Sequence, residues 1–340
     1  MDKTIIALAV CAIVTGLLAL IVGAMLIITY VIFNSVFKRS EARGSIDAPM
    51  SKKTIKMNVK LFGSTFDDYV NKYIKSNLEK VANVETQELE ISSDDGLKLK
   101  GFFTPAPKQS DITVLCIHGY RSNGIGDFAG LLPIFREKNY NYLTINHRAH
   151  GKSEGQYIGF GTLDYLDTRK WIDEINKIVP NGKIIIYGIS MGSATAMLLS
   201  KLDLPNNVIC AIADCGYTSV WDELSYQVKH LYKMPVKPLL NLVESWCISK
   251  AKYDFTTDTP LKAVAEAKIP ILFIHGGNDV FVPTFMVNKC FDACTSEKEL
   301  LIVENAGHAQ AHMINPKLYE DTFFAFVEKH LNAYDDIATA

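Results

Sequence analysis

One serine stands where a sharp turn would present its hydroxyl as a nucleophile. Ser190 lies in Gly188–Gly192, which reads G-x-S-x-G, directly after the apolar run Lys183–Tyr187 and directly before a stretch that favours a helix. A strand, this turn and a helix hold a serine hydroxyl up while the glycines let the neighbouring backbone come close. The pattern also occurs at Gly151–Gly155, but polar residues precede that copy and no helix follows it. We therefore exclude Ser153 as the nucleophile.

A serine hydroxyl attacks a carbonyl only when a base takes its proton. Asp279 and His308 each follow a later apolar run of the chain. Ser, Asp and His in this order, each after a separate strand, predict that His308 is the base and that Asp279 orients it. Two alternatives stay open: Asp214, after the preceding strand, as the acid, and His312 as the base.

Acyl transfer also needs N–H donors for the oxygen that becomes negative in the tetrahedral intermediate. The backbone N–H of Met191 lies at the start of the predicted helix, where the helix dipole favours negative charge. The second donor is predicted to be the N–H of Tyr120, in the loop His118-Gly119-Tyr120 after another apolar run. We expect His118 to brace this loop.

The elements around these residues follow one rhythm. Short, uniformly apolar runs alternate with helical stretches, and such runs are typical of strands covered on both faces. The alternation predicts an α/β fold with a doubly wound, mostly parallel sheet, in which functional residues gather at the carboxyl ends of the strands. Alternating segments around Asp94-Asp95-Gly96 predict an antiparallel hairpin before it. The predicted strands are Ile112–Ile117, Tyr142–Ile145, Lys183–Tyr187, Val208–Ala213, Ile269–Ile274 and Glu299–Val303, and the predicted helices lie near 126–138, 162–178, 191–202, 284–294 and 316–331.

The N-terminal region, residues 1–37, has the pattern of a membrane anchor. The 29 consecutive residues from Ile5 to Phe33 carry no charge, and a helix of that length exceeds the roughly 30 Å hydrocarbon core of a bilayer. The run is too long for a signal peptide and has no small-residue cleavage site, so we predict a single uncleaved span. The basic residues on the two sides of this span are unequal in number. Lys3 is the only one before it, and Lys38, Arg39, Arg43, Lys52 and Lys53 follow it. Because basic residues are enriched on the cytoplasmic side of a membrane, we expect the rest of the chain to be cytoplasmic.

A linker and an amphipathic helix are expected in residues 38–85. Residues 38–55 are mixed polar with Gly44 and Pro49, which is typical of a linker. Apolar residues then recur at helical spacing: Phe66, Tyr69, Val70, Tyr73, Ile74, Leu78 and Val81. We expect this helix to pack on the main domain, with a place on the membrane surface as the alternative.

Composition excludes several classes of protein. Hydrophobic residues make up 48% and charged residues 21% of the 340-residue chain, which excludes a disordered chain. The balance of 35 Lys and Arg against 37 Asp and Glu supplies no basic excess for binding nucleic acid. The seven cysteines contain no C-x-x-C pair, so neither a disulfide framework nor a cysteine-rich zinc site is expected.

Over about residues 86–333 these motifs resemble the α/β-hydrolase superfamily, and more narrowly its bacterial serine aminopeptidase-like and prolyl-oligopeptidase-like esterases and peptidases. The segment Asn146–Gly155 is similar to the family's D-x-R-x-H-G-x-S-x-G loop, with Asn146 in place of the usual Asp. His118-Gly119-Tyr120 is similar to its oxyanion loop. The resemblance implies hydrolysis of esters, thioesters or amides without a metal or organic cofactor, and leaves 334–340 as a tail.

Residues of about 217–262 interrupt the strand and helix rhythm and are rich in apolar side chains. Their position between two strands predicts a cap over the site. We expect either an apolar acyl pocket or a cap packed on its own core. The function predicted from the whole pattern is a membrane-anchored serine hydrolase of esters or thioesters, whose partners are a small-molecule substrate and the lipid bilayer. A serine peptidase and an inactive membrane-tethered scaffold are the alternatives.

Overall fold

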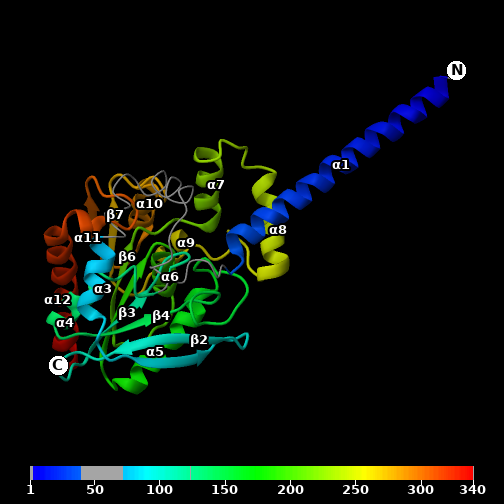
Figure 1. The fold of residues 1–340 in the computed structure, drawn as a ribbon. Coiled ribbons are helices and arrows are strands. Elements are labelled where there is room, and N and C mark those ends of the chain that lie inside the picture. The colour runs from blue at the N-terminus through cyan, green and yellow to red at the C-terminus, as the bar shows by residue number, and fades with distance from the viewer. Residues whose placement is uncertain (1–2, 40–71, 123, 340) are drawn as a thin grey trace.

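In the computed structural model, residues 3–39, 72–122 and 124–339 are described, the last three without their side chains. This described part forms a sheet of eight strands in the order β1-β2-β4-β3-β5-β6-β7-β8 (Figure 1). β1 and β2 pair antiparallel, β2 pairs antiparallel with β4, and all later pairs are parallel. The mostly parallel sheet and its N-terminal hairpin confirm the predicted fold class. The strands are β1 (Gln87–Ser92), β2 (Lys98–Thr104), β3 (Ile112–Ile117), β4 (Asn141–Ile145), β5 (Lys183–Ile189), β6 (Val208–Asp214), β7 (Ile271–Gly276) and β8 (Lys298–Val303).

Helices cover both faces of the sheet, which is why its inner strands β3 to β7 are almost entirely buried. Alternate residues of one strand enter different cores: Leu115 and Ile117 face one, and Val114 and Cys116 face the other. The first core is closed by α5 (Asp164–Ile178), α6 (Met191–Leu199), α9 (Pro260–Val264) and α10 (Phe285–Ala293). The second is closed by α3 (Lys75–Val81), α4 (Leu132–Glu137), α11 (Ala311–Ile314) and α12 (Pro316–Thr339).

Two element boundaries differ from the sequence prediction because of proline. β7 begins at Ile271 instead of residue 269, since Pro270 has no N–H to donate to the neighbouring strand. α4 begins at Leu132 instead of residue 126, and Pro133 lies in its first turn, where its missing N–H costs no hydrogen bond. Of the predicted amphipathic helix, residues 66–71 lie outside the described part of the chain, and α3 packs Val81 into the second core.

The insertion between β6 and β7 consists of α7 (Val220–His230) and α8 (Leu239–Ala251). The predicted cap extended to residue 262 and therefore included the start of α9. In the structure Ala263 and Val264 of α9 belong to the core under the sheet. The part that stands away from the sheet thus ends before α9.

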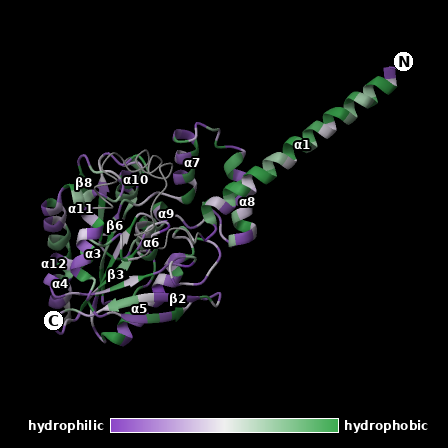
Figure 2. Cartoon of the chain, viewed as in Figure 1, coloured by the Kyte–Doolittle hydropathy of each residue, from purple (hydrophilic) through white to green (hydrophobic). Residues whose placement is uncertain are grey.

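The N-terminal helix α1 (Lys3–Phe37) leaves the domain beside α8 and extends far beyond it (Figure 1). Its free part is almost uniformly apolar (Figure 2). By length and composition α1 is able to cross a membrane. Its other end is different, because Thr29, Phe33 and Phe37 are buried against the domain.

A third apolar cluster joins the end of α1 to the cap and to the start of α6. Phe33 and Phe37 of α1 pack in it with Leu240 and Val243 of α8 and with Met191. The chain continues this contact past the helix, where the N–H of Arg39 donates to the carbonyl of Gln156 at 2.8 Å. Residues 38 and 39, predicted as the start of a linker, are therefore docked on the domain.

Candidate active site

Ser190 occupies the sharp turn between β5 and α6. Its φ of 57° lies in the left-handed region, which a serine adopts only where its surroundings hold it there. Gly192 allows the turn, because a Cβ at this position would lie 1.8 Å from the carbonyl oxygen of Ile117. α6 therefore starts directly against the end of β3, with Ser190 at the carboxyl edge of the sheet.

His308 connects Ser190 to Asp279. Its Nε2 lies 2.9 Å from Ser190 Oγ, and its Nδ1 lies 2.7 Å from Asp279 Oδ2. With the proton on Nδ1, the ring donates to the carboxylate and accepts from the serine hydroxyl. Phe281 packs on the ring with centroids 5.0 Å apart. All three predicted residues are buried and within hydrogen-bonding distance in one chain.

The Asp279 carboxylate has donors on both oxygens. Its Oδ1 accepts the N–H groups of Phe281 and Val282, each at 2.9 Å, in a turn of the kind that aspartate favours. His275 Nε2 lies 3.4 Å from Oδ2. Burial alone raises the pKa of Asp279, but the charge of His308 and the hydrogen bonds from His275 and His308 outweigh it and hold this pKa below its ordinary value.

The loop after β3 lies against the nucleophile. A Cβ on Gly119 would come within 3.2 Å of the Ser190 Cβ. Asp127 fixes the loop, because its Oδ2 accepts the Gly119 N–H at 2.7 Å. Tyr120 follows Gly119, and Met191 is the first residue of α6. The two residues predicted to supply N–H donors are thus the neighbours of Gly119 and Ser190 in the chain, and their role stays a prediction. Asp127 was absent from the sequence prediction, since no motif marks it.

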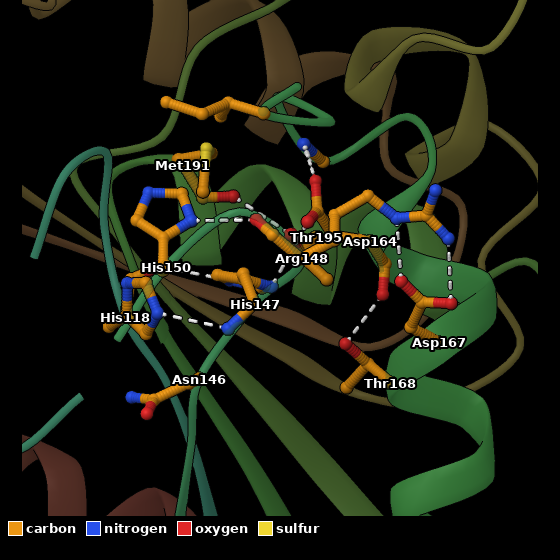
Figure 3. A network of polar contacts seen from close by, with 12 residues as sticks. His118, Asn146, His147, Arg148, His150, Asp164, Asp167, Thr168, Met191 and Thr195 are labelled. Atoms are coloured by element: carbon orange, nitrogen blue, oxygen red, sulfur yellow. Dashed lines mark hydrogen bonds and ion pairs between the residues drawn. The ribbon is translucent and has the colours of Figure 1, made fainter. Parts of the chain in front are cut away.

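Three buried histidines, His118, His147 and His150, connect this loop to the loop after β4 (Figure 3). His118 Nδ1 donates to the carbonyl of Gly119 at 2.7 Å, and its Nε2 accepts the N–H of His147 at 3.1 Å. His150 Nε2 accepts the N–H of Arg121 at 3.0 Å. Burial lowers the pKa of His118, and it lowers those of His147 and His150 to about 3. The histidines are therefore neutral at pH 7 and able to accept these backbone N–H groups.

Arg148 ties the loop after β4 to the rest of the domain (Figure 3). Its guanidinium makes two hydrogen bonds to Asp167 on α5, at 2.8 and 3.0 Å, and two to Asp95 in the hairpin turn, at 3.0 and 3.1 Å. Asn146, which stands where the resemblance expects Asp, accepts the N–H of Lys152 at 3.1 Å. The substitution thus keeps the acceptor that closes this loop and removes its charge.

The alternative residues lie elsewhere. Asp214 Oδ2 accepts the hydroxyl of Tyr319 at 2.8 Å and makes no hydrogen bond to His308. His312 bonds to the hydroxyl of Tyr73 and, through Nε2, to Glu320 at 3.0 Å. Ser153 is buried and donates to the carbonyl of Asn146 at 2.7 Å. The side chains of these residues are held in other contacts, although the backbone carbonyl of Asp214 accepts the N–H of Ser190 at 2.8 Å.

Two features near the site have no signature in the sequence. The hydroxyl of Tyr120 donates to the carbonyl of Val36 in α1 at 2.7 Å, so the end of α1 contacts the predicted oxyanion loop. On the cap, Glu223 is buried, and its Oε2 has no hydrogen-bond partner among the described residues. Burial raises the pKa of Glu223 to about 8 despite a hydrogen bond from Gln227. Both features depend on contacts between distant segments.

Comparisons with known proteins agree with this architecture. A family model described as alpha/beta hydrolase fold matches residues 112–234. YqkD of Bacillus subtilis is 28% identical over 251 residues, covering 74% of this chain and 82% of its own length. Protein bem46 of Schizosaccharomyces pombe is 24% identical over 228 residues, covering 65% of this chain and 69% of its own length.

Among solved structures, the Pyrococcus furiosus esterase Pf2001 superposes with a TM-score of 0.60 at 23% identity, covering 74% of this chain and 94% of that one. This likeness is one of fold. The sheet order, the turn at Ser190 and the match of the family model agree in giving the chain the α/β-hydrolase fold. Within the described residues, no group of three His, Cys, Asp or Glu side chains is arranged to hold a metal ion.

Proposed function

We propose that this protein is a membrane-anchored serine hydrolase that cleaves carboxylic esters or thioesters through an acyl-enzyme. The observation that carries the proposal is the hydrogen-bonded chain Ser190–His308–Asp279, with 2.9 Å and 2.7 Å between the bonded atoms. The α/β-hydrolase fold supports the general chemistry. The roles of the individual residues follow from their geometry.

In the acylation half of the reaction, Ser190 Oγ attacks the substrate carbonyl while His308 Nε2 accepts its proton. The carbonyl oxygen becomes negative and is held by the N–H groups of Tyr120 and Met191. Asp279 stabilises the imidazolium and keeps Nε2 directed at the serine. When the tetrahedral intermediate collapses, His308 returns the proton to the leaving alcohol or thiol, and the acyl group remains on Ser190.

Deacylation repeats these steps with water. His308 Nε2 takes a proton from the water molecule as its oxygen attacks the acyl carbon, and the same two N–H groups hold the second oxyanion. Collapse of this intermediate releases the carboxylic acid, and the proton on His308 returns to Ser190 Oγ. Every group needed is supplied by the chain, so no cofactor enters the scheme.

Labelling with a fluorophosphonate probe tests the nucleophile. We expect the full-length protein to be labelled and Ser190→Ala to lose the label and several orders of magnitude of esterase turnover. Ser153→Ala is the matched control, because this residue stands in the second G-x-S-x-G pattern and should keep the label. No labelling of the folded wild-type protein would favour the inactive scaffold.

The apolar side chains that connect Met191, the neighbour of Ser190, to the cap favour a hydrophobic acyl group. Met191, Phe33 and Phe37 belong to one apolar cluster with the cap residues Leu240 and Val243, and a cluster of this kind suits an alkyl chain better than a polar one. We expect turnover of p-nitrophenyl esters to rise from acetate to longer chains. A flat profile, or a preference for acetate, would contradict the acyl pocket.

The anchor itself is the apolar part of α1. Residues 3–22 are exposed throughout, and at 1.5 Å per residue they span about 30 Å, the thickness of a hydrocarbon core. The basic residues that follow favour a cytoplasmic catalytic domain. Protease added to intact cells should therefore leave the domain uncut, and it should digest the domain after the membrane is opened.

A peptidase acting on short peptides is a second candidate because of Glu223. A buried carboxyl with an unpaired oxygen in the cap is a fitting partner for the ammonium group of a free amino terminus. If this is the function, aminoacyl p-nitroanilides should exceed p-nitrophenyl esters in kcat/KM, and Glu223→Gln should raise KM for the anilides alone. Preference for the esters would exclude it.

A further inference from the structure

The cap carries a basic and apolar surface next to the point where α1 leaves the domain. We call the exposed residues at the end of α7 and in the connection to α8 the cap face: Lys229, Tyr232, Lys233, Met234 and Lys237. Tyr232 and Met234 are large apolar side chains with 66% and 43% exposure. The segment from residue 225 to residue 253 has five lysines and one acidic residue, Glu244, whereas the whole chain has a net charge of −2.

The position of α1 fixes what this surface meets. Residues 3–22 of α1 are exposed throughout, half-buried positions begin at Gly23, and Thr29 is buried. At this level Trp246 of α8 donates to Thr29 Oγ1 at 3.2 Å, and its ring lies 4.9 Å from that of Tyr30. Tyr and Trp are typical of the boundary between a membrane and water. The membrane surface therefore falls beside α8.

The cap face lies on the membrane side of the cap. Figure 1 shows the connection between α7 and α8 at the end of α8 that points in the direction in which α1 leaves the domain. Lysines there meet lipid phosphates, while aromatic and apolar side chains enter the boundary between headgroups and acyl chains. No protein partner is needed to explain this combination, because charge and apolarity both match an anionic bilayer.

We propose that the cap face binds the surface of an anionic membrane, and that the substrates are therefore acyl esters resident in that bilayer. The inference rests on the proposed anchor and hydrolase function and adds the source of the substrate. Leu240 of α8, Phe37 of α1 and Met191, the residue after Ser190, belong to one buried apolar cluster, so apolar packing is continuous from the cap to the residue beside the nucleophile. The end of α1 also holds the Tyr120 hydroxyl.

The binding test uses the full-length chain in vesicles and does not depend on activity. Met234→Cys, in a background with Cys11→Ser, is labelled with an environment-sensitive nitrobenzoxadiazole dye, and Lys317→Cys on α12 is the matched control. In vesicles that contain phosphatidylglycerol, we expect lipids with a shallow nitroxide to quench the dye at position 234 and not at 317. Equal quenching by aqueous iodide at both positions would overturn the proposal, whether or not the protein hydrolyses esters.

The activity test separates bilayer substrates from soluble ones. Lys229, Lys233 and Lys237 are changed together to Gln, and the control changes Lys80, Lys108 and Lys317 to Gln. We expect the first variant to hydrolyse a long-chain fluorogenic ester in phosphatidylglycerol vesicles on the order of tenfold more slowly, with p-nitrophenyl acetate turnover unchanged. Equal losses in both variants would overturn the role of the cap face. Loss of all turnover in Ser190→Ala alone reports on the proposed function separately.

Discussion

Asp279 and Asp214 are two buried aspartates at neighbouring strands: Asp279 follows β7, and Asp214 is the last residue of β6. Their pKa values nevertheless shift in opposite directions. Burial raises the pKa of Asp214 to about 6, because the Tyr319 hydroxyl is a weak counterweight and Oδ1 has no hydrogen-bond partner in the described part of the chain. Asp279 is equally buried, but the charge of His308 and the hydrogen bonds from His275 and His308 hold its pKa low. Nearby hydrogen-bond donors and charges, and not burial alone, therefore decide which of the two carboxyl groups stays ionised.

Removal of the Asp279 charge should have the largest effect. In Asp279→Asn the amide no longer stabilises the imidazolium and favours the wrong tautomer of His308, so we expect kcat for p-nitrophenyl esters to fall about 10⁴-fold. Asp214→Asn should change kcat less than about tenfold, because Asp214 makes no hydrogen bond to His308. Steady-state kinetics of both variants measure the difference. Equal losses would make Asp214 the acid after all.

The same pair should show opposite pH dependence of stability. The folded-state pKa of Asp214 is about 6, above its unfolded value of about 3.9. Unfolding thus releases a proton between these values, and wild-type stability falls as the pH rises through this window. Relative to Asp214→Asn, the wild-type protein should lose about 2 kcal/mol of unfolding free energy from pH 4 to pH 8.

Asp279 has the reverse sign, because its folded-state pKa is lowered. The stability it contributes is present above a pH of about 3.9 and is lost as the pH falls below it. Urea unfolding of the wild-type protein, Asp214→Asn and Asp279→Asn at several pH values measures both effects. Parallel curves for wild type and Asp214→Asn would show that Asp214 titrates normally.

Most strands of the sheet were predictable because the pattern that defines a buried strand lies in consecutive residues of the sequence. A strand covered on both faces has to be apolar along most of its length, and the sequences of β3, β5 and β6 have this composition. Ser190 was also predictable as the residue at a strand-to-helix turn, because the elements on either side of Gly188–Gly192 distinguish it from Ser153. The order of the later residues placed Asp279 and His308 at the same edge of the sheet. Their catalytic roles stay predictions.

Contacts between distant segments were not predictable in this way. Asp127 reaches the Gly119 N–H across a turn, and no spacing rule joins the two residues. The carbonyl of Val36 accepts the Tyr120 hydroxyl although 84 positions separate them, so the helix predicted as an anchor also contacts the predicted oxyanion loop. Glu223 lies in the amphipathic helix α7, and its side chain is buried only by contacts that form in the folded protein.

Tyr319→Phe should give the smallest effect and sharpen the comparison most. The Tyr187 hydroxyl lies 2.7 Å from that of Tyr319, which donates to Asp214 at 2.8 Å. Without the Tyr319 hydroxyl, Asp214 loses its donor, and we expect a loss of about 1–3 kcal/mol of unfolding free energy at pH 7 with little change in kcat.

Tyr187→Phe is the control, because it leaves the Tyr319–Asp214 bond in place and should cost less. In the double variant with Asp214→Asn the cost of Tyr319→Phe should shrink, since the charged acceptor is already gone. An undiminished cost would assign the loss to packing of the ring. The raised pKa of Asp214 would then follow from burial alone, and hydrogen-bond donors would influence the pKa of Asp279 only.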